Sequence, residues 1–210
     1  MNGLKPLKQI SMLLMLSLCF FFSTTSHGAA AISDDKEILY FFSYHCGECY
    51  KQQPYVSILN LALKSHDVDI TPIPLLNNQN WRSSARLYYL LSLSKEHYAL
   101  SSLAREKAGF ALILERPNID SNAQIEYMNL FKDFGMKFSI LDFSNWWKNS
   151  EILLSDTELL ISQFEDELGY ELTPGMLRVS RGQDSHWFDF KEQENKLLLP
   201  DVIEVFNESN

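Results

Sequence analysis

The feature that most constrains the fold of this chain is the sequence Cys-Gly-Glu-Cys at residues 46–49, placed directly after a short apolar run. The run, residues 37–43, is rich in aromatic and branched side chains, which is typical of a buried strand. Residues 50–64 then carry apolar side chains at helical intervals, and Pro54 is expected to kink this helix early. Residues 68–76 are β-branched, and their two prolines favour an edge strand. The order strand, CxxC, helix, strand is the context in which a cysteine pair is redox-active.

The pattern becomes helical from Trp81 to about Glu167. Helices are predicted over residues 81–93, 100–114, 123–134, 143–153 and 156–168. Asp142 or Ser144 is expected to cap the fourth of these helices, and Ser155 or Asp156 the fifth. No strand-like alternation interrupts this block, so it predicts an all-helical unit.

Strand-like segments return after the helical block. Residues 176–179 and 187–190 predict two paired strands around the turn at Arg181 and Gly182, and residues 200–206 predict a short helix with proline at its start. The fold class is therefore α/β, one domain with an all-helical insert. The predicted boundaries are 1–31 for an export signal, 32–80 and 169–210 for the two parts of the α/β domain, and 81–168 for the insert.

The N-terminus has the composition of a secretory signal peptide. Lys5 and Lys8 precede the apolar run 10–22, and small residues follow at 28–31, so we expect cleavage near Ala30 or Ala31. An uncleaved membrane anchor is the alternative, although the run is shorter than the roughly 20 residues that span a bilayer. The sequence therefore predicts an exported protein.

Cleavage changes both the charge and the cysteine content. Residues 1–31 contain two lysines and no acidic residue, so the net charge of −9 becomes −11 in the mature chain. This negative charge argues against nucleic acid or an anionic membrane surface as a partner. Cys19 is lost with the signal, which leaves Cys46 and Cys49. A single pair two residues apart closes too short a loop to stabilise a fold much, so we interpret it as reactive.

The position of Cys46, where a strand opens into a helix, favours its thiolate through unsatisfied backbone N–H groups and the helix dipole. Cys46 is therefore predicted to be the attacking sulfur, and Cys49 the buried thiol that resolves the mixed disulfide. Glu48 is expected to oppose ionisation of Cys46, and His45 could offset this if its ring turned toward the sulfur. Gly47 adds no side-chain donor. The pair should therefore be less oxidising than a CxxC with a basic residue inside.

Metal binding is the main alternative use of two cysteines. A closed tetrahedral zinc site needs two further ligands. The remaining histidines, at positions 45, 66, 97 and 186, are scattered and show no metal-binding spacing. Neither a metal nor any cofactor beyond the Cys46–Cys49 disulfide is predicted, and a Cys–His hydrolase lacks a suitable histidine context.

Residues 41–50, Phe-Phe-Ser-Tyr-His-Cys-Gly-Glu-Cys-Tyr, resemble the active-site segment of the DsbA-like thiol–disulfide oxidoreductases. Residues 134–150 resemble the helical stretch of that family, and Thr173-Pro174 falls where the family has its cis-proline. The resemblance covers residues 36–206. It implies a thioredoxin fold with an inserted helical domain, and periplasmic exchange of disulfides with exported cysteine-containing proteins.

The resemblance also implies roles for particular residues. Cys46 would be the nucleophile and Cys49 the resolving thiol, and Thr173 and Pro174 would form the loop that pairs with an extended substrate. Three features, at Gly47-Glu48, Tyr40 and Thr173, depart from the common pattern of the family. Its central dipeptide is often Pro-His, many members bury an acidic residue at the position of Tyr40, and threonine before the proline is commoner among reductive relatives.

The leading functional prediction is a monomeric enzyme that donates a disulfide and is reoxidised by a membrane partner. The runner-up within the same chemistry is a periplasmic reductase or isomerase. The alternative from another class is a peptide-binding chaperone module with little redox turnover.

Overall fold

The computed structural model describes residues 36–98, 102–182, 184–190 and 199–207. The predicted export signal at residues 1–31 lies outside this part of the chain. Among the described residues, no helix combines the length and the apolar character needed to cross a bilayer. These residues all belong to one compact unit, Ser33–Asn210.

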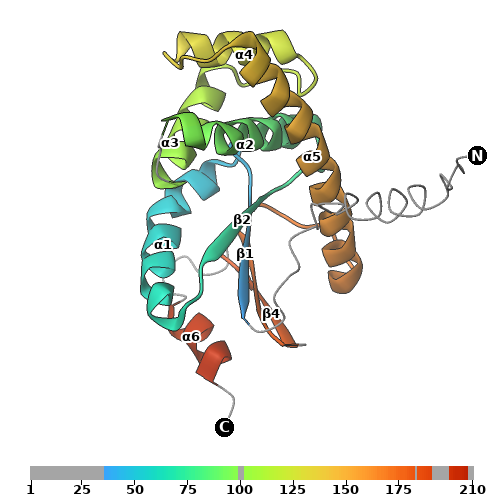
Figure 1. Cartoon of the computed structure of the whole chain (residues 1–210). Helices are drawn as coiled ribbons and strands as arrows, with labels where there is room; N and C mark the ends of the chain where they lie inside the picture. Colours follow the sequence, from blue (N-terminus) through green and yellow to red (C-terminus); the bar gives the residue numbers. More distant parts are fainter. Residues whose placement is uncertain (1–35, 99–101, 183, 191–198, 208–210) are drawn as a thin grey trace, which may run out of the picture. The chain divides into compact units, whose positions relative to one another are not determined.

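Four strands form one mixed sheet (Figure 1). They are β1 (Glu37–Phe42), β2 (Ile70–Pro74), β3 (Met176–Arg181) and β4 (Asp184–Asp189). The strand order is β2-β1-β3-β4, with β1 parallel to β2 and β3 antiparallel to both of its neighbours. β2 lies at an edge of the sheet, as its prolines predict, because an edge strand needs its N–H groups on one side only.

The described part of the chain also contains six α-helices. α1 (Gly47–Leu63) continues into the short 3₁₀-helix η1 (Lys64–His66), and α6 (Leu199–Asn207) follows β4. Between β2 and β3 lie α2 (Gln79–Tyr98), α3 (Ser102–Glu115), α4 (Gln124–Asp133) and α5 (Ile140–Leu168). This order is that of a thioredoxin fold that carries a helical insertion, which confirms the predicted α/β fold class.

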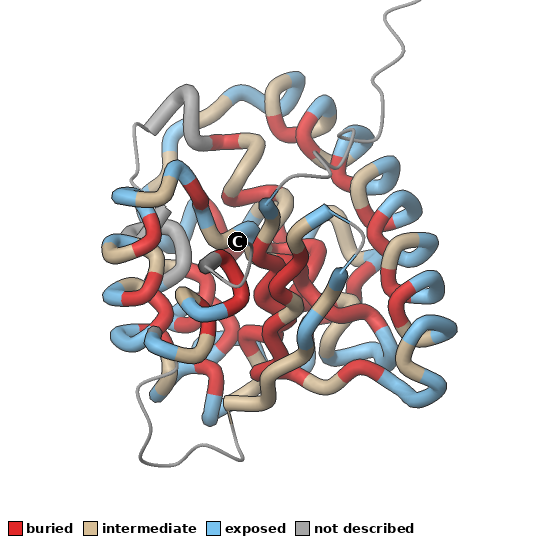
Figure 2. Tube along the Cα trace, turned by 90° about the horizontal axis from the view of Figure 1, so that it is seen from below, coloured by how far each residue is buried: buried red, intermediate tan, exposed pale blue. Residues whose placement is uncertain are grey.

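β1 is buried on both faces because its side chains alternate between two hydrophobic cores. Ile38, Tyr40 and Phe42 lie in a core with residues of α1 and α6. Leu39 and Phe41 lie in a second core with residues of α5. The sheet is thus a central layer between helices, and Figure 2 shows the buried residues gathered in the middle of the molecule with exposed residues outside.

The prediction of two helices over 143–153 and 156–168 is wrong, because α5 is one continuous helix. Ser155 is an exposed residue within it and caps nothing. A single buried stripe runs the length of α5: Phe143, Trp146, Ser150, Leu154, Thr157, Ile161 and Phe164. Spacings of three and four residues keep this stripe on one face, and packing along it outweighs a local capping signal. The helix begins earlier than predicted, where Ser139 is the cap and Asp142 completes the capping box.

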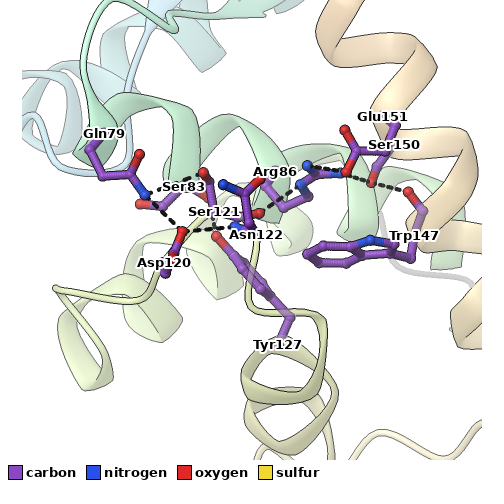
Figure 3. Close-up of polar contacts among 10 residues, drawn as sticks. All are labelled: Gln79, Ser83, Arg86, Asp120, Ser121, Asn122, Tyr127, Trp147, Ser150 and Glu151. Atoms are coloured by element: carbon purple, nitrogen blue, oxygen red, sulfur yellow. Dashed lines mark hydrogen bonds and ion pairs between the residues drawn. The ribbon is translucent and has the colours of Figure 1, made fainter.

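Arg86 of α2 joins three parts of the insert (Figure 3). Its Nε donates to the Ser121 carbonyl at 3.1 Å, in the loop between α3 and α4. Its terminal nitrogens donate to Ser150 Oγ at 2.9 Å and to Glu151 Oε1 at 2.6 Å, both on α5. The guanidinium also lies over the Trp147 ring, 4.3 Å from the centroid. The buried charge is therefore paired and hydrogen-bonded, and it holds the α3–α4 loop against α2 and α5.

Candidate active site

Cys46 is the N-cap of α1, so the helix begins three residues before the predicted start at residue 50. Its backbone is extended (φ −89°, ψ 104°), and its Sγ accepts a hydrogen bond from the Cys49 backbone N–H at 3.1 Å. The sulfur thus takes the place that a serine or aspartate oxygen usually has at a helix start. An N–H donor and the positive end of the helix dipole both favour the thiolate of Cys46. The structure gives Cys46 the surroundings of an attacking sulfur.

Cys49 lies one helical turn further on and is buried, with 1% of its surface exposed. Both cysteines are thiols in this structure. The pKa of the Cys49 thiol is raised well above its ordinary value, mainly by its hydrogen bond with the Cys46 side chain and next by burial. Hydrogen bonds with the Ser43 backbone and, to a smaller extent, with the Tyr40 side chain act in the opposite direction and lower this pKa. In the reduced protein Cys46 would therefore ionise first, and Cys49 would stay protonated until it attacks a mixed disulfide at Cys46.

Gly47 and Glu48, between the cysteines, are both exposed. The Glu48 carboxylate lies 2.7 Å from Lys51 Nζ, and the two side chains are 54% and 71% exposed. The negative charge that was expected to oppose ionisation of Cys46 is thus partly offset by a neighbouring ammonium. Gly47 is exposed, and a Cβ added there would meet no described atom within 4 Å.

The turn before Cys46 is held by the helical insert. The Tyr44 N–H donates to Ser84 Oγ of α2 at 2.6 Å. The His45 ring donates from Nε2 to the Pro117 carbonyl of the α3–α4 loop at 2.8 Å. A neutral imidazole ring carries a proton on only one of its nitrogens. In His45 this nitrogen is Nε2, so the N–H donates to the insert and not to the Cys46 sulfur. Sequence reasoning missed Ser84 and Pro117, which carry no local signal.

A small cavity adjoins Cys49. Its volume is about 10 Å³, close to the space needed for one water molecule, and its lining includes Tyr40, Cys49 and Gln53. The Tyr40 ring stacks on Phe42, with centroids 6.1 Å apart, and meets Phe190 edge-on at 5.9 Å. These contacts fix the ring, so its hydroxyl is kept beside Cys49.

Thr173 and Pro174 precede β3 and lie at the same end of the sheet as the turn that leads to Cys46. The pairing of β1 with β3 places Tyr40 opposite Leu177, and the same register continued places Pro174 opposite Ser43. The Gly175 N–H donates to the Phe41 carbonyl at 2.8 Å, which ties the segment to β1. All peptide bonds of the described residues are trans, including that between Thr173 and Pro174.

The arrangement thus gathers the predicted residues 40, 45–49 and 173–174 around one end of the sheet. In the described part of the chain, no three histidine, cysteine, aspartate or glutamate side chains lie together as metal ligands would. The chemistry available here is that of two sulfurs at a helix start, one partly exposed and one buried.

No protein-family model matches the sequence, and no curated protein matches it. Solved structures do match. A variant of DsbA from Pseudomonas aeruginosa, 16% identical, matches with a TM-score of 0.59 over 85% of this chain and 91% of that chain. The oxidoreductase NmDsbA1 from N. meningitidis, 17% identical, matches with a TM-score of 0.57 over 84% and 86%. DsbL from Salmonella enterica serovar Typhimurium, 16% identical, matches with a TM-score of 0.53 over 85% of this chain and 92% of that chain.

These likenesses extend over most of this chain and of each matching chain. The chain therefore has the DsbA fold, a thioredoxin fold with a helical insertion between its second and third strands. The resemblance found in residues 41–50 is confirmed at the level of the fold.

Proposed function

We propose that this chain is a thiol–disulfide oxidoreductase of the DsbA type that donates a Cys46–Cys49 disulfide to exported proteins. The observation that carries the proposal is the Cys46 sulfur at the start of α1, bonded to the Cys49 N–H, with Cys49 buried behind it. The likeness in fold to DsbA structures supports the same chemistry.

The donor direction proceeds in two exchanges. A substrate thiolate attacks the Cys46 sulfur, the bond to Cys49 breaks, and Cys49 leaves with the electron pair and takes up a proton. A second substrate thiolate then attacks the substrate sulfur of the mixed disulfide, and Cys46 leaves as a thiolate. Two electrons pass from substrate to enzyme. The helix start stabilises Cys46 as a leaving group, which favours this direction.

The sequence also supports a location and a class of substrate for the enzyme. The export signal predicted at residues 1–31 supports a periplasmic location, and a membrane partner would remove the two electrons after each cycle. The net charge of −11 in the mature chain fits protein substrates better than nucleic acid. We propose that the enzyme works as a monomer, without a metal or any other cofactor.

Equilibration against glutathione buffers tests the direction. We expect a reduction potential between about −120 mV, as for DsbA, and about −200 mV, as for glutaredoxins. A potential near the value of thioredoxin, about −270 mV, would instead assign the chain to the reductases.

Oxidative refolding of a reduced test protein checks the chemistry itself. Cys46→Ser and Cys49→Ser should each abolish catalysis of disulfide formation. If both variants keep full activity, the chain acts as a peptide-binding module and the proposal fails. Cys49→Ala should retain mixed disulfides on Cys46, and mass spectrometry of these would identify the substrates.

A further inference from the structure

Glu165, in the last turn of α5, uses its carboxylate to bind groups outside the helix. Its Oε1 accepts the Leu172 backbone N–H at 2.9 Å and the Asn77 Nδ2 at 2.8 Å. The helix end itself is closed by other atoms, because Gly169 (φ 75°) donates its N–H to the Glu165 backbone carbonyl at 2.8 Å. The carboxylate is therefore directed to the segment that leads from α5 to β3.

Asn77, which follows β2, joins a second carboxylate to the first. Its Nδ2 also donates to Glu171 Oε1 at 2.9 Å. The two hydrogens of one amide thus lie between two carboxylates that would otherwise repel each other. As a result, residues 171 and 172 are both fixed immediately before Thr173, and the buried Leu172 side chain anchors the same point in the second core.

The other side of the segment is fixed to β1. Pro174 is buried, and the Gly175 N–H donates to the Phe41 carbonyl at 2.8 Å. Between these anchors, the Thr173 N–H donates to the thioether sulfur of Met176 at 3.4 Å. A thioether is a weak acceptor, so this N–H can exchange it for a peptide carbonyl at little cost.

We propose that Glu165, together with Asn77, is a positioning residue that holds the Thr173–Pro174 segment ready for an extended substrate beside Cys46. This inference rests on the proposed function. Hydrogen bonds to Leu172 and Gly175 fix the two sides of the segment. The weak bond to the Met176 sulfur leaves the Thr173 N–H available to a substrate carbonyl. Because the segment is ordered before the substrate arrives, binding does not have to order it. Loss of the oxygen acceptor at residue 165 would raise the KM for peptide substrates and leave the reactivity of Cys46 unchanged.

The test compares Glu165→Leu with Glu165→Gln, which keeps an oxygen acceptor at the same position. Glu158→Leu is the matched control, because Glu158 lies on the same helix, is 60% exposed and pairs with Arg82 on the surface. Each full-length oxidised protein is assayed with a dithiol peptide and, separately, with reduced glutathione alone. Amide hydrogen exchange of residues 170–176 is measured on the same samples.

Glu165→Leu should raise the peptide KM about fivefold with little change in kcat, and should leave the rate with glutathione within about twofold of wild type. Its residues 170–176 should exchange faster. Glu165→Gln should behave like wild type, and so should Glu158→Leu. The inference is overturned if the peptide and glutathione rates of Glu165→Leu fall in parallel, if Glu158→Leu has the same effect, or if exchange of residues 170–176 does not change. A wild-type protein that is inactive with both substrates would overturn the proposed function itself.

Discussion

Gly109 of α3 lies directly against the ring of Tyr44, so that a Cβ added to Gly109 would overlap the ring. The Tyr44 ring is 4% exposed and meets Phe110 edge-on, with centroids 5.0 Å apart. Tyr44 belongs to the turn that leads to Cys46. The close approach of α3 to this turn therefore depends on the missing side chain.

Gly109→Ala should destabilise the protein by about 1–3 kcal/mol, because the ring or the helix must move to admit the methyl group. Urea unfolding followed by circular dichroism measures the change. Gly47→Ala is the control, since a Cβ at Gly47 would meet no described atom within 4 Å. Equal stability of the two variants would show that α3 can shift freely away from the turn.

Arg86→Met should destabilise the protein by about 3 kcal/mol, because the Ser121 carbonyl and Ser150 Oγ lose a buried donor. Arg82→Met is the matched control: Arg82 is on the same helix, is 34% exposed and pairs with Glu158. An exposed pair contributes little, so the control should change stability by less than about 1 kcal/mol. Thermal unfolding compares the two, and similar losses would mean that the buried network adds nothing beyond the surface pair.

Local patterns were sufficient to predict the elements that position the two cysteines. The apolar run of β1, the position of the cysteine pair after it and the prolines of β2 are each recognised within a few residues. The structure has a strand, a helix start and an edge strand at these three places, as predicted. The helix break predicted near residue 155 was wrong because local patterns do not include packing over the length of a helix. A capping signal is read from two or three residues, whereas the buried stripe that keeps α5 continuous extends over its whole length.

The residues that hold the turn before Cys46 could not be predicted in this way. Ser84 is separated from Tyr44 by 40 residues, and Pro117 from His45 by 72. Neither has a recognisable motif, and Pro117 acts through a backbone carbonyl that every residue type possesses. Such contacts exist once the insert has packed against the α/β part, so tertiary structure is needed to find them.

Lys51→Ala should lower the reactivity of Cys46, because it leaves the Glu48 carboxylate without the ammonium that lies 2.7 Å away. A negative charge without this partner would reduce the fraction of Cys46 present as thiolate at a given pH. The pH at which alkylation by iodoacetamide reaches half of its maximal rate should therefore rise. Glu48→Gln should shift it in the opposite direction, and both shifts should diminish at 1 M salt. A shift that is insensitive to salt would indicate a change in the helix start rather than in charge.

Tyr40→Phe should slow the step in which Cys49 closes the disulfide. The hydrogen bond from Tyr40 lowers the pKa of Cys49, so its removal should raise that pKa further and leave less Cys49 thiolate at neutral pH. When the reduced protein reacts with glutathione disulfide, Cys46 first forms a mixed disulfide, which Cys49 then resolves. In the variant this intermediate should persist about fivefold longer, as expected for the loss of one neutral hydrogen bond.

The sign of the pH dependence separates this effect from a loss of structure. Raising the pH should restore the closure rate of Tyr40→Phe, because the thiolate fraction of Cys49 then recovers. The first step, attack by Cys46, should keep the wild-type rate at every pH. Tyr50→Phe is the control, because Tyr50 follows Cys49 directly but is 56% exposed. Rapid acid quenching and mass spectrometry resolve the two steps, and a closure rate that stays low at high pH would show that Tyr40 acts through packing and not through the ionisation of Cys49.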